Sequence, residues 1–103
     1  MHEGHRERMR QQLRQSGMDS LSDVQVIEVL LYHAFSRQDT NLLAHALLKR
    51  FGSLAGVFEA PVPELTKVPG IGESAAELIA LVPQIERRHL ISRARMESIL
   101  TST

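Results

Sequence analysis

A short glycine-rich turn, Val68-Pro69-Gly70-Ile71-Gly72, limits what this chain of 103 residues can fold into. Two glycines on either side of one aliphatic residue let the backbone reverse within a few residues, because glycine reaches positive φ without a Cβ clash. Apolar residues precede the turn, and an apolar pattern with helical spacing follows it. The sequence therefore predicts two helices joined by a tight turn, with Ile71 inserted between them.

The main-chain N–H groups of this turn form a candidate anion site. They stand at the start of the second helix, where the helix dipole is positive, so they can receive a phosphate. This pattern is typical of a helix-hairpin-helix, a module most often found on DNA, although a turn that only joins two helices would show the same residues. The candidate nucleic-acid contacts are Lys67, Val68, Pro69, Gly70, Ile71 and Gly72 of the turn, with Arg6 and Arg10 as supporting charges.

Composition indicates one small helical domain. Hydrophobic residues make up 43% of the chain but aromatic residues only 4%, so the core must be aliphatic, which suits packed helices. No apolar run approaches the roughly 20 residues that a membrane span needs, and no signal peptide is visible. The chain contains no cysteine, which excludes a disulfide framework or a thiolate zinc site and fits a cytoplasmic protein.

The charges of the chain balance, with twelve basic and twelve acidic residues. A dedicated nucleic-acid binder usually carries an excess of basic residues, so the zero net charge argues against strong autonomous DNA binding. It is compatible with a weak contact. Arg6, Arg10 and Arg14 recur every four residues and share one helix face. That face can touch phosphate, but the interleaved Glu7 favours a solvated surface.

Capping residues predict most helix boundaries. Ser22 with Gln25 forms a capping box for a helix over 22–34, after a polar helix over 3–15 and a turn at 16–19. Asp39 caps a helix that ends at Gly52, and Ser53 caps a short helix after it. The connection between the helices over 22–34 and 39–51 falls at 36–38.

The second half of the chain is expected to contain a brief helix from 61 and a long helix after Gly72. Pro83 is expected to interrupt and kink this long helix, which resumes from Gln84 to about Ile99. The helices at 22–34 and 39–51 resemble the pair around the turn but lack its glycines. We therefore expect an all-α, compact helical domain with a tandem helix-hairpin-helix architecture, one good hairpin at 68–72 and one degenerate. The expected divisions are an N-terminal polar helix at 1–18, the helix-hairpin-helix domain at 19–90, and a helical extension or linker at 91–103.

No arrangement of side chains in the sequence points to catalysis. His2 and His5 could share a metal, but a solvent-exposed pair is favoured because no cluster of carboxylate or thiolate ligands accompanies them. We expect no catalytic residue, no metal and no cofactor. Apolar residues around Val82, Ile85 and Leu90 suggest the alternative, a surface for another protein or for dimerisation.

Several short motifs, in this order and spacing, resemble the N-terminal domain of the RadC family. The motifs are Gly4-His5-Arg6-Glu7-Arg8, Leu21-Ser22-Asp23, Glu28-Val29-Leu30-Leu31, Arg37-Gln38-Asp39-Thr40-Asn41 and the FGSL and PGIG stretches. The stretch from Leu47 to Gly72 is also similar to the tandem helix-hairpin-helix domain at the C-terminus of a bacterial excinuclease. Members of the RadC family carry a historical label of DNA repair protein and join this domain to a C-terminal domain of the JAB/MPN metalloprotease type.

The resemblance implies a non-catalytic accessory domain, because the His-x-His pair of a JAB/MPN metal site is absent here. Its partners would be DNA, bound weakly and without sequence preference, or the JAB/MPN-type domain. The exposed apolar residues named above suggest a second copy of the chain as another partner. Three positions depart from the family pattern. Pro61 replaces a usual serine cap, Pro63 replaces a common acidic residue, and Glu73 stands where DNA-binding hairpins often carry a basic residue. A carboxylate at that point would repel a phosphate in the same cradle.

Overall fold

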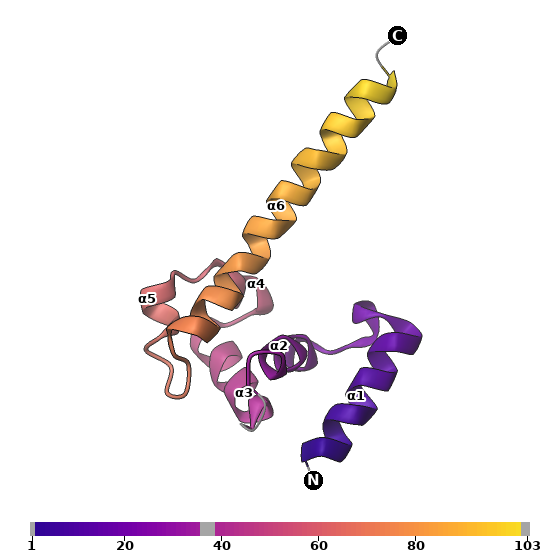
Figure 1. Cartoon of the computed structure of the whole chain (residues 1–103). Helices are drawn as coiled ribbons and strands as arrows, with labels where there is room; N and C mark the ends of the chain where they lie inside the picture. Colours follow the sequence, from indigo (N-terminus) through magenta and orange to yellow (C-terminus); the bar gives the residue numbers. More distant parts are fainter. Residues whose placement is uncertain (1, 36–38, 102–103) are drawn as a thin grey trace.

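The structure, a computed structural model, describes residues 2–35 and 39–101, and the connection predicted at 36–38 lies outside them. Within these residues there are helices and no strand, which confirms the all-α prediction. The elements are α1 (His2–Ser16), the 3-10 helix η1 (Met18–Ser20), α2 (Asp23–Tyr32), α3 (Thr40–Phe51), α4 (Leu54–Glu59), α5 (Val62–Leu65) and α6 (Glu73–Thr101), shown in Figure 1. The tandem arrangement of two hairpins stays a prediction.

Local capping places the starts of α2, α3 and α4, and the end of α3, where the sequence predicts them. Ser22 Oγ accepts a hydrogen bond from the Gln25 N–H, and Gln25 Oε1 accepts one from the Ser22 N–H, which completes the capping box of α2. Asp39 caps α3, and Gly52 ends it in the left-handed conformation at φ +86°. Ser53 caps α4 through the Gly56 N–H. By contrast α5 has no side-chain cap, because Pro61 occupies that position.

The main core lies between α2, α3, α4, α5 and the first turns of α6. Its largest fully buried side chains are Ile27, Leu31, Leu47, Val57, Leu65 and Ile79. A separate small cluster of Met9, Val29 and Tyr32 attaches α1 to the outer side of α2. The helix α1 is therefore held by a different and smaller set of apolar contacts than the rest of the fold.

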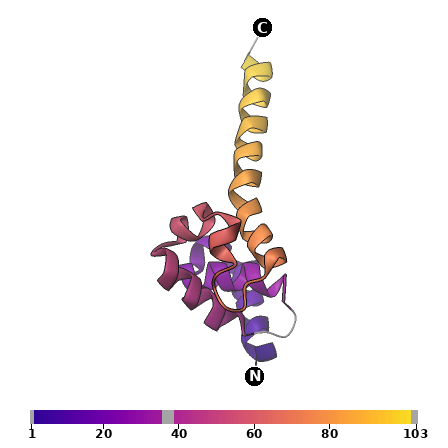
Figure 2. The same cartoon turned by 90° about the vertical axis from the view of Figure 1, so that its left-hand side faces the viewer.

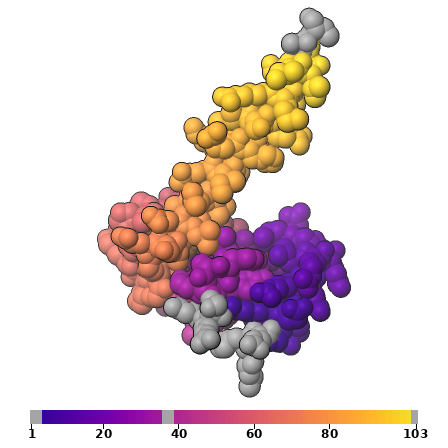
Figure 3. Space-filling model, in the orientation of Figure 1, coloured from indigo at the N-terminus to yellow at the C-terminus, as the bar shows by residue number. Residues whose placement is uncertain are grey.

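Most of α6 projects away from this core. Its buried residues are Ala75, Ala76 and Ile79, all in the first two turns, and the remainder stands clear of the body in both orientations of the ribbon and in the space-filling view (Figures 1, 2 and 3). The principal extents of 57 × 35 × 22 Å reflect this projection. No helix in the described ranges is both long enough and apolar enough to cross a membrane.

The predicted interruption at Pro83 is wrong, because α6 runs unbroken from Glu73 to Thr101 with Pro83 inside it. A proline in a helix removes the one hydrogen bond that its missing N–H would make to the carbonyl four residues earlier, here that of Ile79. The helical hydrogen bonds on both sides of this gap keep α6 a single element.

Candidate nucleic-acid interface

The turn before α6 is a tight reversal held by one internal hydrogen bond. The Ile71 N–H donates to the Val68 carbonyl at 3.0 Å, and Gly70 has a φ of +92°. Proline in the second position and glycine at positive φ in the third are typical of a type II turn. Ile71 is only 3% exposed and joins the main core, as the sequence predicts.

The N–H groups of this turn are not all available to a ligand. That of Ile71 is used inside the turn, so the expectation that it stays open is wrong for this residue. Gly70 and Gly72 are exposed, and no hydrogen bond among the described residues uses their N–H groups. The first internal bond of α6 runs from the Ala76 N–H to the Gly72 carbonyl, so the first-turn N–H groups also lack helical partners.

The nearest predicted cation, Lys67, is already paired with a carboxylate. Lys67 Nζ lies 2.6 Å from Glu64 Oε2, and Arg50 lies 3.3 Å from the other oxygen of the same carboxylate. The hydrogen bond and charge of Lys67, followed by those of Arg50, hold the pKa of Glu64 below its ordinary value. Glu64 therefore partly neutralises the positive charge beside the turn.

The acidic side chains that follow the turn have no such partners. Glu73 and Glu77 are exposed, and neither forms an ion pair within residues 2–35 and 39–101. Glu73 stands in the first turn of α6, where its negative charge interacts favourably with the helix dipole. The same charge competes with any anion that approaches the free N–H groups.

The other two predicted cations lie far from the turn. In Figure 1, α1 and the turn before α6 are on opposite sides of α2 and α3, and Figure 2 shows the same separation in depth. The guanidinium carbons of Arg6 and Arg10 lie 5.3 and 5.4 Å from the ring centroid of Tyr32. Both side chains therefore help to pack α1 on α2 by cation–π contact. The structure does not bring the predicted contact residues onto one surface.

A buried polar cluster that the sequence analysis missed ties α1, α2 and α3 together. Glu28 is only 3% exposed; one of its oxygens lies 2.8 Å from His5 Nε2, and the other accepts from Asn41 Nδ2 at 3.2 Å. His5 is thus bonded rather than simply solvated, while the side chain of His2 lies outside the described residues. The sequence does contain one indication of this cluster, since a glutamate between Ile27 and Val29 in a mostly apolar helix is expected to be buried and paired.

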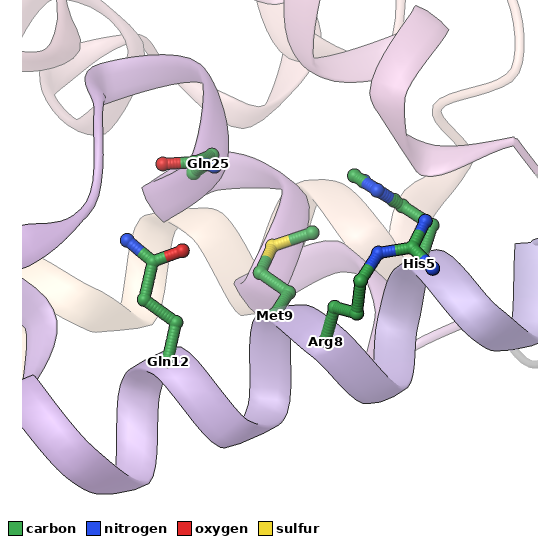
Figure 4. A pocket seen from close by; sticks show the side chains of 5 residues that line it. All are labelled: His5, Arg8, Met9, Gln12 and Gln25. Carbon is green, nitrogen blue, oxygen red and sulfur yellow. The ribbon is translucent and has the colours of Figure 1, made fainter.

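A shallow polar hollow lies between α1 and the start of α2 (Figure 4). Its cavity volume is about 220 Å³, and it is lined by His5, Arg8, Met9, Gln12 and Gln25. Gln12 Nε2 donates to the Ser20 carbonyl, and Gln25 belongs to the capping box of α2. Gln12 therefore ties α1 to η1, and Gln25 closes the start of α2, which gives both amides a structural role without a ligand.

A second hollow is almost entirely apolar, and we call it the apolar groove. Its volume is about 400 Å³, and it is lined by Leu13, Met18, Val26, Val29, Leu30, His33, Phe58 and Val82. His33 is its one titratable side chain, and its Nδ1–H donates to the Val29 carbonyl at 2.8 Å. Because the lining comes from α1, η1, α2, α4 and α6, together with His33 just beyond α2, no local sequence pattern could have revealed the groove.

The described ranges contain no group of three or more histidine, aspartate or glutamate side chains arranged to hold a metal ion. No solved structure matches the chain. The family model described as UPF0758 N-terminal matches residues 2–77, which is most of the chain and covers the body of the fold up to the first turns of α6. The match agrees with the motifs at both ends of that range, and the chain therefore belongs to the UPF0758 N-terminal family, the N-terminal region of RadC-family proteins.

Proposed function

We propose that this chain is a non-catalytic accessory domain that binds the nucleic-acid backbone weakly and without sequence preference. The observation that supports this is the exposure of Gly70 and Gly72, whose N–H groups have no acceptor in the described residues and stand at the positive end of α6. Such main-chain donors position a phosphate but read no base.

The surrounding charges limit the affinity of this contact. Lys67 is engaged by Glu64, Glu73 repels phosphate, and Arg6 and Arg10 lie on another side of the molecule. Few counterions would be released on binding, so the affinity should fall less steeply with salt than it does for a basic DNA-binding domain. The contact is an auxiliary one that helps to position a larger protein.

Fluorescence anisotropy with labelled single-stranded and branched DNA tests this function. We expect weak binding at about 50 mM salt, and about fivefold tighter binding for Glu73→Lys, because replacing a repelling charge by an attracting one at a helix N-terminus is worth about 1 kcal/mol. Glu97→Lys makes the same charge change on α6 away from the turn and should leave the affinity nearly unchanged.

Amide NMR spectra give a second readout of the same contact. Added DNA should shift the resonances of Gly70, Gly72 and Glu73, and it should leave those of Arg6 and Arg10 in place. If neither the native chain nor Glu73→Lys binds DNA at low salt, the hairpin serves only to join α5 and α6.

A second candidate function, docking onto a protein, is favoured by the apolar groove. A groove of this volume lined almost wholly by apolar side chains is typical of a helix-docking surface. The JAB/MPN-type domain is the partner that the family resemblance implies, and a second copy of the chain is the partner that the exposed apolar residues of α6 suggest.

A reporter at the edge of the groove tests docking. Met18 is 46% exposed and the chain has no cysteine, so Met18→Cys offers a single site for an environment-sensitive dye. Docking of an added RadC-family JAB/MPN-type domain, or of a second copy, should shift the dye emission to shorter wavelength. An emission unchanged by either partner would reject docking at this groove.

A further inference from the structure

The projecting part of α6 carries a second unpaired apolar feature, which we call the α6 stripe. Positions 82, 85, 89, 92, 96 and 99 recur at alternating intervals of three and four, the spacing of a coiled-coil seam. The apolar members beyond Val82 are strongly exposed, with 63% for Ile85, 57% for Met96 and 74% for Ile99. Val82 also lines the apolar groove, so the stripe and the groove form one continuous surface.

The spacing of the stripe suits antiparallel pairing with a copy of itself. If Ile99 of one helix faces the partner's Val82, then Ile85 faces the partner's Met96 and His89 faces the partner's Ser92. The end of each α6 then reaches the groove of the other molecule. Leu100, which is 77% exposed, lies seven and fourteen residues after Arg93 and Glu86 and so shares their flank of the stripe. His89 and the partner's Ser92 at the centre would fix this alignment of the two helices, because a polar residue within an apolar seam fixes the alignment of coiled coils.

The flanking charges favour the same arrangement over a parallel one. In the antiparallel register Glu86 lies opposite the partner's Arg93 on the groove side, and symmetry repeats this pair. Glu86 has no partner among the described residues, while Arg93 lies 3.8 Å from Glu97 of its own helix. Parallel pairing would instead place Arg88 beside the partner's Arg93. In the antiparallel dimer Arg88 faces the partner's Arg95 on the solvent side, which weakens the dimer.

We propose that two copies of this chain associate through antiparallel pairing of their α6 stripes, each helix end closing the apolar groove of the other molecule. The proposal rests on the docking function and names its partner as a second copy. It requires no other protein and no metal or cofactor.

Sedimentation equilibrium tests the association. The native chain should form a dimer, and Ile85→Asp should weaken the dimer at least tenfold. Leu90→Asp is the matched control, because Leu90 is 59% exposed on the same helix but lies about 140° around it from Ile85. Far-ultraviolet circular dichroism checks that both variants keep their helices. A native chain that stays monomeric at about 1 mM, or equal effects of the two variants, would overturn the proposal.

Charge exchange and disulfide trapping test the register. Glu86→Arg should weaken the dimer, and adding Arg93→Glu to it should restore the dimer. A mixture of Val82→Cys and Ile99→Cys chains should form a mixed disulfide, whereas neither variant should link to itself, because like positions lie about 25 Å apart in the antiparallel register. Self-linking of Ile99→Cys would indicate parallel pairing and reject the model.

The proposal can fail separately from the functions on which it builds. If the chain is monomeric but the dye on Met18→Cys responds to a JAB/MPN-type domain, docking stands and pairing of two copies is rejected. The DNA affinity of Ile85→Asp, measured on the same samples, should equal that of the native chain because the turn is not involved.

Discussion

Replacing Gly70 by alanine is the perturbation that most directly tests the geometry of the turn. Gly70 has a φ of +92°, a conformation that costs a residue with a Cβ about 1–2 kcal/mol. The added Cβ would also lie 2.6 Å from Leu43 Cδ2, so the leucine side chain must move. This overpacking costs about 1 kcal/mol, and the lower entropy of the unfolded alanine chain recovers about 0.5 kcal/mol. The net loss should be about 2 kcal/mol.

Two other glycines separate the components of this loss. Gly52 also has a positive φ, +86°, but a Cβ there would meet nothing within 4 Å, so Gly52→Ala should cost about 1 kcal/mol from backbone strain alone. At Gly72 the structure shows neither a positive φ nor a neighbour within 4 Å. Gly72→Ala should therefore leave stability unchanged or raise it by about 0.5 kcal/mol.

Urea denaturation followed by circular dichroism measures these differences as shifts in midpoint at constant slope. We expect Gly72→Ala to be the most stable of the three variants, Gly52→Ala to be less stable, and Gly70→Ala to be the least stable. Leu43→Ala should cost less in the Gly70→Ala background than in the native chain, because the smaller side chain relieves the contact. Equal losses for the Gly70 and Gly72 variants would refute the turn geometry, and strict additivity would refute the contact with Leu43.

Three further predictions concern the ion pairs and a helix cap. The pKa of Glu64 in the folded chain is lowered from 4.5, so its pairing with Lys67 stabilises the fold above pH 4.5 and this stabilisation is lost as the pH falls through the lower folded pKa. Lys67→Met should therefore reduce the loss of stability at acid pH, measured by urea titrations. His5→Ala should cost about 1–3 kcal/mol of stability, measured by thermal unfolding, because it leaves the buried Glu28 carboxylate with the Asn41 amide as its one donor among the described residues. Glu28→Met should cost less, because it removes the buried charge itself. Ser22→Ala should cost about 1 kcal/mol, seen as a fall in melting temperature, because the capping box is lost.

Several features of the fold could be predicted because they depend on neighbouring residues. Ser22, Asp39 and Ser53 each cap a helix through backbone groups two or three positions away, and Gly52 ends α3 through its own φ. The burial of Ile71 also follows from the turn, since an aliphatic side chain between two glycines must leave water when the flanking helices meet. The effect of Pro83 was the exception: the sequence predicted an interruption, whereas α6 continues through it.

The functional surfaces depend on contacts that no local pattern contains. The pairing of Arg50 with Glu64, the packing of Arg6 and Arg10 on Tyr32, and the separation of α1 from the turn require residues distant in sequence to meet. The apolar groove likewise draws its lining from several elements. Sequence alone determined the helix caps, the turn and the family motifs, because hydrogen bonding and backbone sterics act over a few residues. Tertiary structure decided which charges are already paired and where apolar surface remains open, because both depend on how whole helices pack.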